Sequence, residues 1–171
     1  MNNPVNNTNN ANAAHAMDPH PSTLKPTDTI GHAADIIMQS RYRNLPVVDE
    51  NFCYLGMFGV NCLLKQVIPE AVFLSQALSN ISFIHESFAD LYQRFDSVKD
   101  NPVATCMHQE IEPVAPDTSL SEVILQLYLT RSSIPVVEPG SCKLLGMISY
   151  WDIGSKILAA GEHVERPLND A

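Results

Sequence analysis

An internal repeat is the feature that most limits how this chain can fold. Three short segments recur in the same order, and the matched pairs are Leu24–Ile30 with Val114–Leu120, Leu45–Asp49 with Ile134–Glu138, and Leu55–Phe58 with Leu145–Ile148. The offset is 90 residues for Pro26 and Pro116, 89 for Pro46 and Pro135, and 90 again at the matched glycines. Because three ordered matches at nearly constant spacing do not arise easily by chance, the sequence predicts a duplicated unit.

Each copy predicts the same succession of elements. A helix comes first, two β-rich runs joined by a turn follow, and a second helix closes the unit. The expected strands are 45–48 and 54–60 in the first copy and 134–137 and 143–149 in the second. The expected closing helices are 61–67 and 150–160, the latter ended by Gly161. A β-α-β-β-α unit of about fifty residues is near the lower size limit for a stable core, so the copies are expected to pack together through their sheets.

The first helix of each copy carries start signals. In the second copy, Ser119 and Glu122 form an S-x-x-E capping box. The apolar residues that follow at helical spacing are Val123, Ile124, Leu127 and Tyr128. In the first copy, Asp28 or Thr29 can cap the matching helix. Its predicted inner face consists of Ala33, Ile36, Ile37 and Ser40.

The segments outside the copies differ from them in composition. Seven of the first twelve residues are Asn, which predicts a disordered tail over residues 1–16. The copies then occupy 17–68 and 106–160, with a C-terminal tail at 161–171. Periodic apolar residues in the connection, 69–105, predict two helices. Those helices either cover the core or form a dimer or partner interface.

Composition excludes several classes of protein. The net charge of −9 disfavours binding to duplex nucleic acid or to an acidic membrane surface, since both require a basic face. No signal peptide and no membrane-spanning stretch is evident. The four cysteines are spread singly, without a C-x-x-C pair. That usage favours a reduced, cytoplasmic chain over a disulfide framework or a zinc knuckle.

The duplicated motifs resemble a known family. The order P-x-x-T/S-h, helix, h-P-V-V-D/E, h-G-h-h is found twice over about residues 17–160, and in the second copy it is followed by S-x-x-D-h. This order resembles a tandem pair of cystathionine β-synthase (CBS) domains, called a Bateman module. The resemblance implies an α/β fold in which two β-α-β-β-α repeats pack sheet to sheet as a pseudo-twofold pair, with the helical connection inserted. It also implies a homodimer whose clefts between repeats bind adenosine compounds and regulate a partner, here unknown.

The best candidate site lies at the start of the last helix. Ser149 can interact with the free amides there or with a phosphate at the positive helix end. Asp152, one turn later, is an acceptor suited to two ribose hydroxyls, and in the CBS family the matching residues contact phosphate and ribose. The alternative is that S-x-x-D is only a capping box. Both roles are compatible.

Other contacts rest on the resemblance alone. Ser133, before the h-P-V-V strand, matches a phosphate-contacting position but is uncharged, and the opening strand around Pro21 and Thr23 is expected to complete the site. The resemblance therefore implies AMP, ADP, ATP or S-adenosylmethionine as a regulatory ligand, with AMP and S-adenosylmethionine fitting better than ATP. In the first copy, Gly59 and Cys62 replace Ser149 and Asp152, which predicts a degenerate cleft.

No catalytic set is recognisable. The six histidines lack zinc spacing, no required cofactor or metal is expected, and Cys62 and Cys106 are predicted to be core residues. Trp151 or Tyr150 is a candidate to flank an adenine, but core packing is the more frequent role of a lone Trp, so Trp151 is expected in the core. The chain is thus predicted to be a stand-alone regulatory module and not an enzyme. The alternative is a ligand-free dimerisation or interaction scaffold with degenerate nucleotide clefts.

Overall fold

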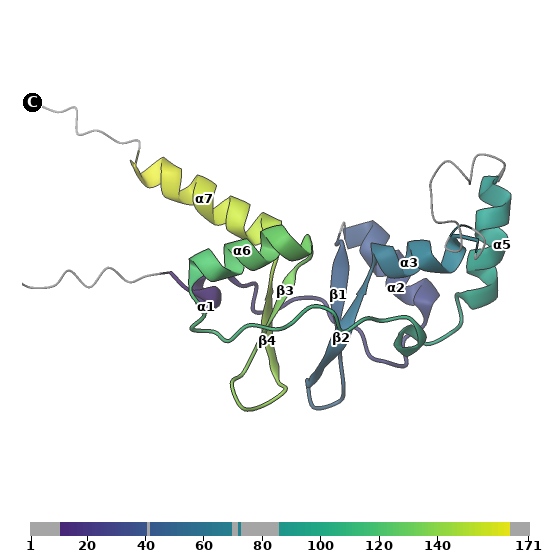
Figure 1. The fold of residues 1–171 in the computed structure, drawn as a ribbon, viewed down its shortest axis with the longest axis horizontal. Helices are drawn as coiled ribbons and strands as arrows, with labels where there is room; N and C mark the ends of the chain where they lie inside the picture. The colour runs from purple at the N-terminus through teal and green to yellow at the C-terminus, as the bar shows by residue number, and fades with distance from the viewer. Residues whose placement is uncertain (1–10, 41, 70–71, 73–85, 165–171) are drawn as a thin grey trace, which may run out of the picture. The chain divides into compact units, whose positions relative to one another are not determined.

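The computed structural model describes residues 11–40, 42–69, 72 and 86–164. They fall into two compact units. The first-repeat unit is Ser22–Glu110, and the second-repeat unit combines Met1–Pro21 with Ile111–Ala171. Figure 1 shows a β-hairpin with accompanying helices in each. Two small antiparallel sheets with helices confirm the predicted α/β class.

The first-repeat unit is built on one antiparallel hairpin. Its elements are α2 (Ile30–Ser40), β1 (Asn44–Val48), β2 (Tyr54–Gly59), α3 (Val60–Val67), α5 (Phe88–Val98) and a 3₁₀ turn, η2 (Val103–Thr105). Thr29 Oγ1 accepts from the His32 amide at the start of α2, so Thr29 supplies the helix cap. Asp28 instead accepts from the Lys25 amide.

The second-repeat unit has the same plan. Its elements are α1 (Ala13–Ala16), α6 (Leu120–Thr130), β3 (Ile134–Val137), β4 (Leu144–Ile148) and α7 (Tyr150–Val164). Ser119 Oγ accepts from the Glu122 amide at the start of α6. In both units, the strands and closing helices begin within one residue of their predicted positions. The two hairpins also share an irregularity, because the register shifts at Val136/Val137 in this one and at Val47/Val48 in the other.

Each hairpin gains a short extended segment on both edges. Leu24 pairs with β1 in parallel, and His108 pairs with β2 in antiparallel fashion. At the same positions 90 residues away, Val114 pairs with β3 and Asp18 with β4. Asp18 and Leu24 are six residues apart in sequence yet belong to different units. The segments around Asp18 and His108, which precede the first and the second repeat, thus each pair with the hairpin of the other copy.

The core of each unit is apolar. In the first-repeat unit, α2 places Ala33 and Ile37 against Phe58 and the β1 side chains. In the second-repeat unit, Val123 and Leu127 of α6 are the buried equivalents. Among the described residues, no polar or charged residue falls in the buried class. Each hairpin is therefore held against its first helix mainly by the hydrophobic effect.

Two predicted boundaries are wrong. Residues 13–16 form α1, not disordered tail, because Ala13 and Ala16 are buried and the Ala13 amide donates to Thr118 O at 2.9 Å. Helix α7 continues past Gly161 to Val164. Among the described glycines only Gly56 and Gly140 have positive φ, so Gly161 does not adopt the left-handed conformation that ends a helix.

The connection between the copies is partly described. Its predicted first helix, around 72–78, lies almost wholly outside the described residues, whereas its predicted second helix is α5. Phe95 and Val98 of α5 pack partly buried against the first-repeat core, and Arg94 Nε donates to Val67 O at 2.6 Å. Phe88 on the same helix is 90% exposed. Helix α5 therefore covers the end of α3 with one face and leaves apolar side chains in solvent on another.

The cysteines differ in state. Cys62 is buried in the first-repeat core, as predicted, and Cys106 packs against that core. Both are free thiols. Cys53 and Cys142 are disulfide-bonded, so the expectation of a fully reduced chain is wrong for them. Isolated cysteines carry no spacing signal from which a disulfide could be read.

The first-repeat unit is expected to lose stability in alkaline solution. Burial, with the Cys62 thiol nearby, raises the pKa of Cys106 from 9.0 to about 11, and burial raises that of Tyr54 from 10.0 to about 12. The unfolded chain releases these two protons at a lower pH than the folded chain does. The stabilisation is therefore fully present below the ordinary pKa values of 9.0 and 10.0, and it is lost as the pH rises towards 11 and 12.

Urea unfolding between pH 8 and about 11 tests this linkage. We expect the midpoint to fall across that range, and Cys106→Ala to flatten the fall. A midpoint equally pH-dependent in wild type and variant would count against the role of Cys106.

Candidate functional site

Ser149 and Asp152 meet at the junction between β4 and α7. The Ser149 amide donates to Asp152 Oδ2 at 2.7 Å, and Ser149 Oγ donates to the same oxygen at 2.5 Å. The Asp152 amide donates back to Ser149 Oγ at 3.3 Å. This is a complete reciprocal capping box, so the capping role that the sequence suggested is present.

The box leaves one carboxylate oxygen available. Both bonds from Ser149 end on Oδ2 of Asp152, and within the described part of the chain Oδ1 receives no hydrogen bond. The Ser149 hydroxyl donates to Asp152 and accepts from its amide, so it is engaged in both directions. Asp152 can therefore accept from a ligand without breaking the cap, whereas Ser149 can donate to a phosphate only by releasing Asp152.

The other predicted site residues, Ser133, Pro21 and Thr23, do not all belong to the same unit. Ser133 is half-buried and directly precedes β3, whose Ile134 pairs with Ile148. That register places Ser133 and Ser149 at the same end of the hairpin, opposite its turn (Figure 1). Pro21 belongs to the same unit. Thr23 belongs to the first-repeat unit.

The same capping geometry occurs elsewhere. At the start of α5, the Ser87 amide and hydroxyl donate to Asp90 Oδ2 at 2.9 and 2.6 Å. The Asp90 amide donates to Ser87 Oγ at 3.2 Å. These bonds lower the pKa of the Asp90 carboxyl. An S-x-x-D box is therefore not by itself a ligand site. The feature that distinguishes the Ser149–Asp152 pair from the Ser87–Asp90 pair is its position at the end of β4.

The first copy has a different junction. The Gly59 amide donates to Cys62 Sγ at 3.4 Å, so the thiol occupies the capping position of the carboxylate. A Cβ on Gly59 would lie 2.8 Å from Arg43 O and 2.9 Å from the Asn44 Cβ. A serine cannot enter there without moving the chain before β1, so the hydroxyl–carboxylate pair is missing for a steric reason.

The aromatic residues at the start of α7 are only partly as expected. Trp151 is 78% exposed, so its predicted place in the core is wrong. Tyr150 Oη donates to Leu127 O at 2.5 Å and fastens α7 to the last turn of α6. The sequence gives no signal for this bond, because it depends on the approach of two helices. Arg131 ends α6 in the left-handed conformation, and the matching Arg41 lies outside the described residues.

Two other site types have no support in the described ranges. No three His, Cys, Asp or Glu side chains gather there closely enough to hold a metal ion. None of the helices described combines the length and apolar character that a membrane crossing requires.

The fold is thus a tandem α/β repeat. A Ser–Asp pair, Ser149 and Asp152, lies at the strand–helix junction of its second copy. The CBS domain family matches residues 13–68 and 101–158. Because these segments make up more than half of the sequence, the chain belongs to the CBS domain family, as a tandem CBS pair. A search of curated proteins finds no match.

Solved structures share the fold. An acetoin utilization protein (AcuB) from Vibrio cholerae has a TM-score of 0.68 and 21% identity, covering 92% of this chain and 98% of that one. CBSX2, from Arabidopsis thaliana, in complex with AMP has a TM-score of 0.64 and 19% identity, covering 88% and 98%. CbpB in complex with c-di-AMP has a TM-score of 0.63 and 12% identity, covering 91% and 89%.

Proposed function

We propose that this chain is a CBS-pair regulatory module that binds an adenosine-type ligand at the β4–α7 junction and modulates a partner protein. The observation that carries the proposal is the Asp152 carboxylate, half-buried at the start of α7, with one oxygen engaged in the cap and the other without a hydrogen bond in the described chain. In this assignment Asp152 accepts from ribose hydroxyls, and Ser149 turns towards a phosphate. No catalytic role is proposed.

The class of ligand follows from the chemistry of the junction. An ionised carboxylate binds donors, and two adjacent ribose hydroxyls supply two of them. The positive end of α7 favours a phosphate nearby. Ser133 carries no charge, which favours AMP or S-adenosylmethionine over ADP and ATP. The complexes of CBSX2 with AMP and of CbpB with c-di-AMP support an adenosine compound as the ligand class.

Regulation follows if the ligand prefers one arrangement of the module. A ligand can shift a conformational equilibrium only by its difference in affinity for the two states. We propose that this shift acts in a homodimer and is transmitted to a partner protein.

Isothermal titration of the purified chain with AMP, ADP, ATP and S-adenosylmethionine tests the ligand proposal. We expect saturable binding of at least one compound, with a dissociation constant on the order of micromolar, and weaker binding as phosphates are added. Adenine-free ribose 5-phosphate is the control and should bind far more weakly. Absence of binding to all four compounds by a folded sample would overturn the proposal.

A ligand-free scaffold is the second candidate. It is favoured by the complete capping box, which gives Ser149 and Asp152 a structural role, and by the serine-excluding geometry at Gly59. In that case the titrations are silent while the protein still associates with itself.

A further inference from the structure

The first-repeat unit holds two free thiols that the proposed function does not use, Cys62 and Cys106. Cys62 is the third residue of α3 and is 5% exposed, whereas Cys106 directly follows η2 and is half-buried. Both side chains pack in or against the same apolar core. The proposed ligand residues Ser149 and Asp152 belong to the other unit. The two thiols are therefore a separate feature, and solvent reaches the pair at Cys106.

The backbone pairing beside β2 brings the two cysteines to one place. Met57 of β2 and His108 exchange two backbone hydrogen bonds, 2.8 and 2.9 Å long, in an antiparallel bridge. Gly59 lies two residues further along β2, and Cys106 lies two residues before His108, so the antiparallel direction sets Cys106 near Gly59. The Gly59 amide in turn donates to Cys62 Sγ at 3.4 Å. Both thiols therefore lie where β2 passes into α3.

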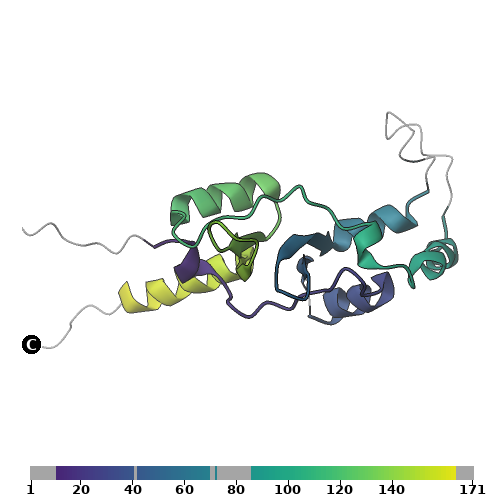
Figure 2. The same cartoon turned by 90° about the horizontal axis from the view of Figure 1, so that it is seen from below.

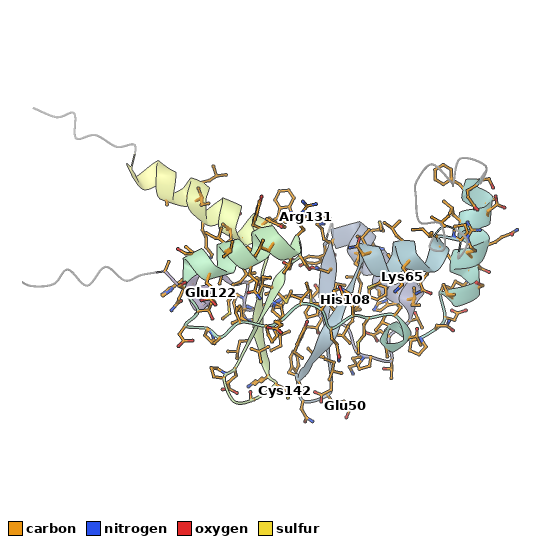
Figure 3. The ribbon with its side chains drawn as sticks, viewed as in Figure 1. Glu50, Lys65, His108, Glu122, Arg131 and Cys142 are labelled. Carbon is orange, nitrogen blue, oxygen red and sulfur yellow. The ribbon has the colours of Figure 1, made fainter. Side chains whose placement is uncertain are left out.

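The surroundings of the two thiols are apolar, with a basic side chain close by. Burial, with the Cys62 thiol nearby, raises the pKa of Cys106 to about 11. Burial also raises the pKa of Cys62, against the opposing effect of Lys65 one turn later on α3. Figure 3 labels Lys65 on α3 and His108 on the segment beside β2. Buried thiols with a raised pKa are poor nucleophiles, so the pair is not suited to covalent catalysis or to rapid oxidation.

The sulfur donors favour one class of ligand, a soft metal ion. Met107 directly follows Cys106 and also packs partly buried against the core, which adds a thioether to the neighbourhood. Thiolate and thioether ligands select Cu(I), whereas carboxylate and water suit Mg²⁺ and Ca²⁺. Zn²⁺ takes four ligands in structural sites, and in the described ranges no third His, Cys, Asp or Glu lies close enough to begin such a set. Cu(I) is satisfied by two thiolates, so this donor set fits that ion.

The second copy shows that the repeat does not require either thiol for folding. At an offset of 90, Cys62 corresponds to Asp152 and Cys106 to Ala16. The edge segments that contain or follow these positions make the same bridges to β2 and β4. Asp152 caps its helix with an oxygen, and Ala16 fills its place with a methyl group and is 2% exposed. Capping and packing at these two places therefore do not demand sulfur, and both sulfurs occur in the first copy.

We propose that Cys62 and Cys106 bind one Cu(I) ion as two thiolates at the β2–α3 junction. Each thiol gives its proton to solvent and forms one Cu–S bond, while the copper stays in the Cu(I) state. Two thiolates and one Cu(I) leave a single negative charge. Lys65 and the positive start of α3 balance that charge, and Glu110 opposes it.

The bound ion ties the start of α3 to the segment that follows η2. Because the ion binds the folded unit, it stabilises that unit against unfolding. Figure 1 and Figure 2 show α3 between the hairpin and α5, so the ion also stabilises the helix on which α5 rests. The copper site goes beyond the proposed function and does not depend on it, since the two use residues of different units.

Anaerobic titration of the full chain with Cu(I), in competition with the coloured chelator bicinchoninate, tests the site. We expect one Cu(I) per chain and an ultraviolet thiolate-to-copper absorption band. Cys106→Ala copies Ala16 of the second-repeat unit, so it should fold. It should bind Cu(I) at least about 100-fold more weakly, since loss of an outer-shell partner alone can cost that much. The matched control is Cys53→Ser/Cys142→Ser, which removes two disulfide-bonded sulfurs and should leave the affinity unchanged.

A second variant and a second measurement keep the test independent of Cys106→Ala. Cys62→Ser should also lose tight binding, because its hydroxyl can cap α3 but is a poor ligand for a soft ion. Cu(I) should raise the urea midpoint of the wild-type chain and leave that of Cys106→Ala unchanged. A folded wild-type chain that takes no Cu(I) from the chelator, or an unchanged affinity in either cysteine variant, would overturn the two-thiolate site.

Discussion

Replacing Asp152 by alanine is expected to weaken AMP binding by at least about 100-fold. The substitution removes the acceptor proposed for two ribose hydroxyls, and a hydrogen bond to a charged group contributes about 1.5–3 kcal/mol. It also removes the cap at the start of α7, where the Asp152 carboxylate accepts from the Ser149 amide at 2.7 Å. That loss should reduce the free energy of unfolding by about 1 kcal/mol. Titration calorimetry and urea unfolding of the same sample measure the two effects.

A second capping box provides the matched control. Asp90 makes the same pattern of bonds with Ser87 at the start of α5. Asp90→Ala should therefore cost a similar stability and leave the affinity for AMP unchanged. Asp152→Asn should retain much of the cap, because its amide oxygen still accepts, and yet lose most of the affinity with the charge. If Asp152→Ala binds AMP like the wild-type protein, Asp152 is a cap only.

Local pattern predicts most of the fold. Strands β1 to β4 are short apolar runs next to recognisable turns, and the duplicated order shows that each run recurs in the same context. The capping residues Thr29 and Ser119 are visible because a hydroxyl next to an apolar periodic segment has few other roles. The extended segments at Asp18 and His108 are different. Each pairs with the hairpin of the other copy, and no local pattern in these segments indicates that pairing.

Exposure is harder to predict than secondary structure. Helical spacing assigns Val123, Ile124, Leu127 and Tyr128 to one face, but α6 buries only the first and third. An apolar helix has no polar face by which its orientation can be read. The prediction for Trp151 fails for a different reason: a lone large aromatic residue is usually a core residue, but Trp151 is 78% exposed. The tail prediction fails at Ala13, where a small apolar residue in a low-complexity context is buried against α6 by tertiary contacts.

The sequence predicts that Ser149 and Asp152 form a pair, but it does not decide whether that pair binds a ligand. Three-residue spacing at a strand–helix junction brings Ser149 and Asp152 together, and the sequence alone suggests this. The equal geometry at Ser87 and Asp90 shows that the spacing specifies a cap. Discrimination between cap and ligand site depends on the neighbourhood, to which Ser133 contributes through the β3–β4 register. The tertiary approach that sets Tyr150 against Leu127 has no sequence signature.

Gly146→Ala is expected to be among the most destabilising single-methyl substitutions in the chain. A Cβ on Gly146 would lie 2.5 Å from Asp18 O and 2.8 Å from Met17 Sδ. The neighbouring bonds between Asp18 and Met147, 2.8 and 3.0 Å long, hold the edge segment where this methyl would go. Overpacking costs about 1–3 kcal/mol, and loss of the two hydrogen bonds adds about 1 kcal/mol each. Urea unfolding should therefore show a loss of about 3–5 kcal/mol.

The repeat supplies both an equivalent and a control for this substitution. Gly56→Ala places a Cβ 2.7 Å from His108 O and also strains the backbone at φ +156°, so it should release the matching segment of the first-repeat unit at a cost at least as large. Gly161 meets nothing within 4 Å and is helical, so Gly161→Ala should stabilise α7 by about 0.5–1 kcal/mol. Gly146→Ala and Gly161→Ala add the same methyl group without strain at a positive φ, so opposite signs at these two positions point to the close approach of the edge segment at Gly146. Equal effects at the three positions would mean that these segments do not hold the hairpins as described.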